Sequence, residues 1–281
     1  MNARTEQKIA FSFLFFCTVL VVIPVVVILT IITIKGAGAI NFEFLFSMPT
    51  DGMSSGGILP AILGTLYLVL LAVIFAVPLG VLSAIYLVEY GHDNFTSRII
   101  KLAIVNLAGV PSVVYGLFGL GIFVVFFGFG VSILSGSLTL GIMILPVIIT
   151  SSIEALESVP KSFRMVSRSL GASKWQTIRH AVLPHALPGI LTGTILGLGR
   201  AAGETAPILF TVAAFYLPTL PQSVFDQTMA LPYHLYVIST QVPGMSEMSR
   251  YGTALVLLML VLLMNLAAII LRYRFRKKKK W

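Results

Sequence analysis

The chain has 281 residues, of which 57% are hydrophobic and only 10% are charged. Soluble globular domains carry about 25% charged residues, and a soluble fold of this length could not hide so much apolar surface. The net charge of +9 does not indicate nucleic-acid binding, because the basic residues lie at the edges of apolar runs, where membrane proteins use them to set orientation. The composition predicts an all-α membrane protein with about six transmembrane helices.

The first predicted span covers residues 9–34, which is long enough to cross a bilayer that requires about 20 residues. The following Ala37-Gly38-Ala39 is similar to a secretory cleavage site. However, the run far exceeds the apolar region of about 7–15 residues found in signal peptides, so we treat it as a membrane helix. Residues 1–56 then form an N-terminal helix with an external loop, and residues 57–281 form the core.

Five further spans follow from apolar stretches with few or no charges. They are predicted at residues 59–88, 99–127, 138–153, 187–214 and 251–271, with the long stretch 102–153 divided at a Gly/Ser-rich segment, 128–137. The only cysteine, Cys17, lies inside the first span, so an intrachain disulfide is excluded.

Basic residues predict the orientation. If both termini are cytoplasmic, the cytoplasmic segments hold 16 of the 19 Lys and Arg residues, in groups of two, two, five and seven. Only Lys35 and Arg250 are external, and Arg200 falls within a span. This asymmetry favours the stated topology over its inverse. The basic tail 276–280 is expected to anchor the last helix at anionic lipid.

The cytoplasmic loop 155–186 reads as two helices. Pro160 can begin the first, Phe163, Val166 and Leu170 share one face, and Gly171 ends it. The second is expected to begin with Ser173 in a capping box with Gln176 and to end near Leu183-Pro184. Such a loop can be a solvated connection, a helix-turn-helix element or a docking site for a cytoplasmic partner; its ordered design favours docking. The other long loop, 215–250, is expected outside the membrane.

One charged pair lies in the fifth predicted span. Arg200 and Glu204 are four residues apart and therefore share a helix face. Each charge costs about 2.5–3.5 kcal/mol inside a membrane, so the pair is either a structural ion pair or an oxyanion contact in a translocation path. Arginine presents planar donors that suit phosphate or sulfate.

A stripe of small residues runs along the same helix at four-residue intervals. It predicts close packing against another helix. Its members are Gly189, Gly193, Gly197 and Ala201.

Polar residues in other spans are candidates for the same path, although such residues commonly hydrogen-bond neighbouring helices. These candidates are Ser112, Tyr115, Thr65 and Thr205. His180 and His185 are too weak a pattern to predict metal, and we expect no metal site or nucleic-acid binding.

Several segments resemble the permeases of binding-protein-dependent ABC importers. Gly171 and Leu183-Pro184 fall at the spacing of the family's cytoplasmic EAA loop, although Met165, Val166 and Ser167 replace Glu-Ala-Ala. The segment Arg200-Ala-Ala-Gly-Glu204-Thr-Ala-Pro resembles the signature of phosphate permeases of the PstA type. Residues 77–80, 85–91, 110–117 and 187–193 resemble the same group.

The resemblance implies a type I ABC importer (MetI-like) permease fold and half of a phosphate-conducting pore. It implies a PstC-like second permease, two PstB-like ATPase subunits that bind ATP and Mg, and an external phosphate-binding protein. The chain itself lacks a phosphate-binding loop and is expected not to be an enzyme. The resemblance places ATPase coupling at Arg164, Arg168, Leu170, Gly171, Ala172, Ser173, Leu183 and Pro184.

The implied location is the cytoplasmic membrane of a bacterium or archaeon. Three other functions stay open. The chain can belong to a permease for sulfate, molybdate or phosphonate, since Arg200 suits each of these. It can be a proton-coupled secondary anion transporter with Glu204 as a relay. A membrane-anchored sensor is disfavoured because the loops are too short for an output domain.

Overall fold

The computed structural model describes residues 3–91 and 95–277. The elements in chain order are α1 (Ala3–Gly36), η1 (Ala37–Ala39), α2 (Phe42–Phe46), β1 (Pro49–Thr50), η2 (Asp51–Met53), β2 (Ser55–Gly56), α3 (Leu59–Ile85), η3 (Tyr86–Tyr90), α4 (Phe95–Ala108), α5 (Ser112–Gly119), η4 (Leu120–Phe126), α6 (Ile133–Glu157), α7 (Lys161–Ser169), α8 (Lys174–Thr177), η5 (Ile178–Val182), α9 (Leu183–Gly203), α10 (Ala206–Thr211), α11 (Leu231–Thr240) and α12 (Glu247–Lys277). Of the predicted basic tail, residues 278–280 lie outside the described range.

The expectation of about six membrane helices is confirmed. Five helical stretches of the described chain are long and apolar enough to cross a membrane: Gln7–Ala39, Leu59–Tyr90, Ile133–Glu157, Lys174–Gly203 and Glu247–Phe275. A bent pair, Phe95–Ala108 with Ser112–Phe126, makes up to six. The two-residue strands β1 and β2 pair antiparallel and are a small addition to an otherwise helical chain.

The third span is not the single straight helix that we predicted at residues 99–127. It bends by 104° between α4 and α5. Pro111 precedes α5 and has no N–H for a continuous helix, and it also disfavours helical backbone at the preceding residue. Hydropathy alone does not show this bend, because apolar residues continue on both sides of it.

The fifth span also differs from its prediction at residues 187–214. α8, η5 and α9 form one helical stretch from Lys174 to Gly203, so the expected helix end near Leu183-Pro184 is wrong. The π-helical turn η5 (Ile178–Val182) ends two residues before Pro184. Such a wide turn accommodates the hydrogen bond that proline cannot donate. At its other end, α9 stops at Gly203.

The core is built around α3, α6 and α9, and the small-residue stripe confirms its predicted role. A Cβ placed on Gly193 would lie 2.4 Å from Ser151 Cβ, and one on Gly189 would lie 2.5 Å from Ala155 Cβ. Both partners belong to α6. Only glycine at these positions allows the two backbones to approach so closely.

The segment expected as an external loop at 215–250 contains a buried helix, α11. Residues 228–234 are all buried, and the backbone N–H of Leu231 donates to Thr65 Oγ1 on α3 at 2.8 Å. α11 is too short to cross a membrane, yet it packs against α3 and α12 as part of the core. The prediction of a loop therefore did not include this buried helix.

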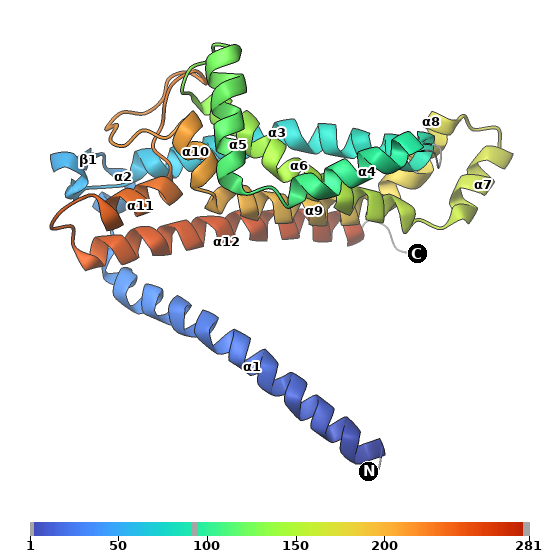
Figure 1. Ribbon diagram of the computed structural model, residues 1–281, viewed down its shortest axis with the longest axis horizontal. Coiled ribbons are helices and arrows are strands. Elements are labelled where there is room, and N and C mark those ends of the chain that lie inside the picture. Colours follow the sequence, from blue (N-terminus) through green and yellow to red (C-terminus); the bar gives the residue numbers. More distant parts are fainter. Residues whose placement is uncertain (1–2, 92–94, 278–281) are drawn as a thin grey trace.

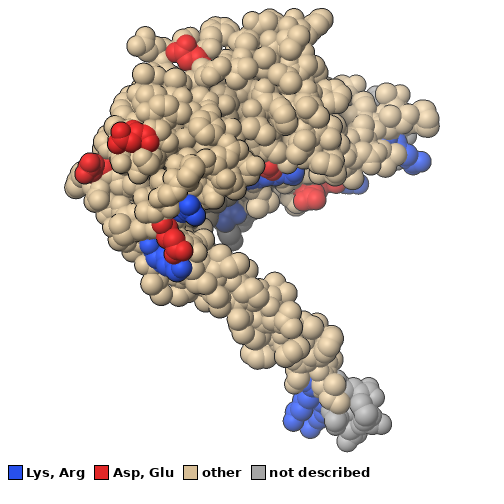
Figure 2. Space-filling view, turned by 60° about the vertical axis from the view of Figure 1, so that its left-hand side comes forward, with Lys and Arg blue, Asp and Glu red and all other residues tan. Residues whose placement is uncertain are grey.

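α1 leans away from the body and packs at its C-terminal end against α12 (Figure 1). There, a Cβ on Gly36 would lie 2.5 Å from the Tyr251 carbonyl oxygen. Residues 9–34 of α1 are apolar and almost all exposed. The space-filling view shows the uncharged middle of this helix, with charged side chains near both of its ends and in a few small groups on the body (Figure 2).

Candidate functional site

The Arg200–Glu204 pair lies where α9 ends. Arg200 Nε and Glu204 Oε1 are 3.4 Å apart, and the two side chains are 35% and 19% exposed. Glu204 is the C-terminal cap of α9 and has extended backbone, with φ −80° and ψ 132°. The two residues therefore meet at a helix terminus and not within the continuous helix that we predicted.

Pro207 accounts for this break. In an uninterrupted helix it would lack the hydrogen bond to the Gly203 carbonyl and its ring would collide with that turn. The chain instead leaves the helix at Glu204 and Thr205 and restarts as α10 at Ala206. The positive side chain of Arg200 consequently lies in the last turn of α9, where the helix dipole favours a cation.

α5 brings further predicted residues to this break. A Cβ on Gly116 would lie 2.9 Å from the Ala206 carbonyl oxygen, so α5 and α10 are in close contact. Tyr115 is buried, and its hydroxyl donates to the Leu107 carbonyl at 2.7 Å. Ser112 lies one turn before Gly116 and is half-buried.

Next to this region is a recess of about 320 Å³ formed where α4 bends into α5. Its lining includes Leu107, Val110, Val114, Tyr115 and Phe118, and its exposed surface is apolar. Such a surface provides no ligand for an oxyanion. The polar part of the candidate path is therefore the α9 end, beside this recess.

Thr65 lies apart from this group. It is buried on α3, donates to the Ala61 carbonyl at 2.8 Å and accepts the Leu231 N–H. Its hydroxyl thus holds α11 onto α3. A role for Thr65 in the translocation path stays a prediction, and the observed contacts are those of a packing residue.

The first part of the loop 155–186 has the predicted local structure. α7 follows Pro160, Gly171 has φ +82°, and Ser173 forms a capping box with Gln176. The positive φ explains the glycine, because other residues seldom adopt that backbone.

α7 also has an outward apolar face. Met165, Val166 and Leu170 are exposed, Leu170 at 82%, whereas Phe163 packs against the core. Ala172 is half-buried, and the side chain of Arg168 is exposed. Leu183 and Pro184 are half-buried within the continuous helix and do not lie on the exposed tip of the loop.

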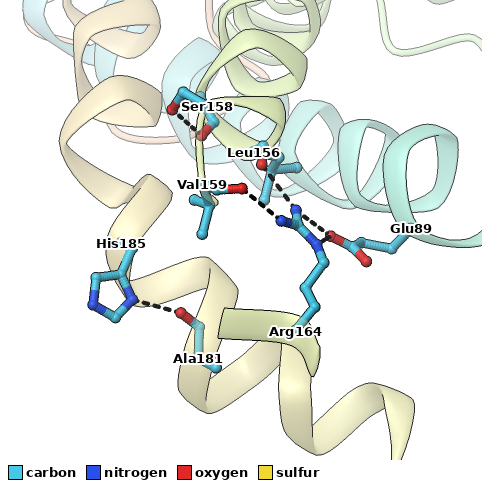
Figure 3. Close-up of polar contacts among 8 residues, drawn as sticks. Glu89, Leu156, Ser158, Val159, Arg164, Ala181 and His185 are labelled. Carbon is cyan, nitrogen blue, oxygen red and sulfur yellow. Dashed lines mark hydrogen bonds and ion pairs between the residues drawn. The ribbon is translucent and has the colours of Figure 1, made fainter. Parts of the chain in front are cut away.

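Arg164 does not face outward as an ATPase contact would. Its guanidinium turns toward the body and pairs with Glu89 at 2.7 Å (Figure 3). Sequence reasoning missed Glu89 as a site residue. The available signal was a lone carboxylate directly after the charge-free stretch 52–88, since such charges are seldom left without a partner.

Within the described residues, no group of three or more His, Cys, Asp or Glu side chains could hold a metal ion.

Comparison with known proteins identifies the family. The family model described as "Binding-protein-dependent transport system inner membrane component" matches residues 76–281. The chain is 34% identical to "Phosphate transport system permease protein PstA 1" of Mycobacterium tuberculosis, over 100% of this chain and 92% of the relative. It is 31% identical to "Probable ABC transporter permease protein YqgI" of Bacillus subtilis, over 95% of each.

Solved structures agree on the fold. An ABC transporter involved in alginate import matches with TM-score 0.65 at 16% identity, covering 96% of this chain and 99% of that one. The MetNI methionine transporter matches with TM-score 0.60 at 16% identity, covering 76% and 94%. The chain is thus a membrane-embedded transport permease with the MetI-like fold and not an enzyme, and it belongs to the family of binding-protein-dependent transport system inner membrane components.

Proposed function

We propose that this chain is the permease subunit of an ATP-driven phosphate importer and forms half of its pore. Relatives named as phosphate transport permeases, 34% identical in both Mycobacterium tuberculosis and Methanocaldococcus jannaschii, support the substrate. The observation that carries the proposal is the position of Arg200, a partly exposed cation at a helix break inside an apolar protein.

Arg200 can exchange its partner for an oxyanion. Charge-assisted hydrogen bonds are commonly about 2.7–2.9 Å long, and the 3.4 Å separation from Glu204 indicates a loose ion pair. A phosphate oxygen would meet the planar donors in a better geometry. The carboxylate of Glu204 would then repel the anion, which favours its release.

The proposed importer also implies its partners. A PstC-like permease would complete the pore, an external phosphate-binding protein would deliver substrate, and two PstB-like ATPases would bind ATP and Mg. The exposed apolar side chains of α7, Met165, Val166 and Leu170, suit docking to such an ATPase.

We place the chain in the cytoplasmic membrane with both termini in the cytoplasm. The N-terminal end of α1 and the C-terminal end of α12 point toward the end of the long axis where α7 and α8 lie. The elements α2 and β1 lie at the opposite end (Figure 1). The positive-inside rule assigns the basic end to the cytoplasm. The exposed side of α1 would face lipid or the second permease. Transport would proceed by alternating access, with Arg200 exposed first outward and then inward.

The test is uptake of labelled phosphate by cells whose own copy of this chain is deleted. Native chain should restore uptake, with competition from phosphate and not from sulfate or molybdate. Arg200→Ala should reduce uptake at least tenfold at equal membrane abundance. Competition by another oxyanion would reassign the substrate, and uptake that needs a proton gradient but no ATPase would favour a secondary transporter.

A further inference from the structure

We propose that the Glu89–Arg164 pair is the joint through which movement of α7 reaches the core helices α3 and α6. Both side chains would then be positioning residues for transport and neither would contact substrate or ATPase. The inference rests on the proposed function, because it requires an ATPase that moves α7.

The geometry of the joint is specific. Glu89 Oε1 accepts from Arg164 Nε at 2.9 Å and from Nη2 at 2.7 Å. The same guanidinium donates to the Leu156 carbonyl at 2.9 Å and the Val159 carbonyl at 2.7 Å. The side chains are only 17% and 6% exposed. Figure 3 shows this single guanidinium between the three acceptors.

These contacts join three elements. Arg164 is on α7, and Glu89 is in η3, which continues α3. Leu156 lies in the last turn of α6, and Val159 lies in the short connection between α6 and α7. The last carbonyls of a helix have no partner within it, and here Arg164 supplies one. Along the chain, α7 is joined to α6 by residues 158–160. Its contact with the end of α3 includes the ion pair between Arg164 and Glu89.

α7 presents opposite faces to the body and to the outside. At about 100° per residue, Val166 lies about 200° and Leu170 about 240° around the helix from Arg164. Those two side chains are exposed. A partner bound to the outer face would therefore push on one side of α7, and the inner side would pass the displacement to α3 and α6, which pack closely through Gly80 and Ile148.

A second ion pair at the same edge provides a contrast. Lys101 and Glu157 are 4.0 Å apart, and their side chains are 46% and 55% exposed. Exposed pairs of this kind contribute little, whereas removing one member of a buried pair leaves an uncompensated charge. Of these two ion pairs, the buried Glu89–Arg164 pair is the one suited to hold two elements in a fixed relation.

The test uses the complete transporter in proteoliposomes. We would compare the native complex with Glu89→Gln, Arg164→Lys, the Glu89→Gln/Arg164→Gln double variant and the control Glu157→Gln. The readouts are the amount of ATPase that co-purifies, the rate of ATP hydrolysis, and phosphate imported per ATP hydrolysed.

We expect both single variants to retain bound ATPase and ATP hydrolysis but to import at least fivefold less phosphate per ATP. The double variant should be no worse than either single change, because the two residues act as one unit. Glu157→Gln should match native. An unchanged ratio of phosphate to ATP in Glu89→Gln, or loss of ATPase binding in both single variants, would overturn the inference. If the native complex itself imports no phosphate, both the proposed function and this inference are wrong.

Discussion

The hydroxyl of Thr65 is expected to hold α11 in place, and Thr65→Val tests this directly. Valine has nearly the same shape but cannot accept the Leu231 N–H, which now bonds the hydroxyl at 2.8 Å in a buried site. Leaving such a donor without a partner costs about 1–3 kcal/mol. We therefore expect the free energy of unfolding to fall by that amount. The melting temperature should fall by about 2–4 °C for each kcal/mol that is lost.

The assay is thermal unfolding in detergent, followed by phosphate uptake at equal membrane abundance. Thr65→Ser retains the acceptor and should lose much less stability, so it is the matched control. Thr65→Val should reduce uptake only as far as it reduces the folded population. A Thr65→Val protein that melts like native but no longer transports would refute the packing argument and return Thr65 to the translocation path.

Three other outcomes are expected. Gly193→Val should lower the free energy of unfolding by about 1–3 kcal/mol, because the valine side chain would overlap Ser151. The control in the same thermal assay is Gly203→Ala, since a Cβ at Gly203 would meet open space. Leu170 is the C-terminal cap of α7 and is 82% exposed. Leu170→Asp should reduce the amount of ATPase that co-purifies without changing the melting temperature, and equal co-purification would exclude this face as the docking site. Burial lowers the pKa of His234 from 6.5 to about 4, so the unfolded chain binds the extra proton between these values and stability should fall by roughly 3 kcal/mol as pH drops from 6.5 to 4. His234→Gln should remove that part of the pH dependence, measured as melting temperature at pH 5 and pH 7.5.

Features set by neighbouring residues could be predicted from the sequence. The capping box at Ser173 and Gln176 involves atoms three residues apart, and the left-handed turn at Gly171 follows from the absence of a side chain. The glycine stripe of α9 is equally local, because its spacing repeats along one helix. These predictions are confirmed because no distant contact is needed to decide them.

The direction of Arg164 could not be predicted in the same way. Its partner Glu89 is 75 residues away, and nothing in the spacing of α7 distinguishes an arginine that contacts an ATPase from one that turns back to the body. The same limit applies to α11. Its apolar residues lie in a segment too short to cross a membrane, and only the fold shows that α3 and α12 cover them.

The two helix breaks were hidden because hydropathy continues through them, yet together they give a physical reason for the location of the site. Backbone groups released by a break in an apolar environment need a partner within the protein or an aqueous cavity. Tyr115 satisfies the Leu107 carbonyl at the end of α4, and the second break, before Pro207, contacts α5 through Gly116. Irregular backbone from two spans is thus concentrated beside Arg200. This combination of a cation and interrupted helices would suit a path for an anion, because it offers polar groups that continuous apolar helices do not provide.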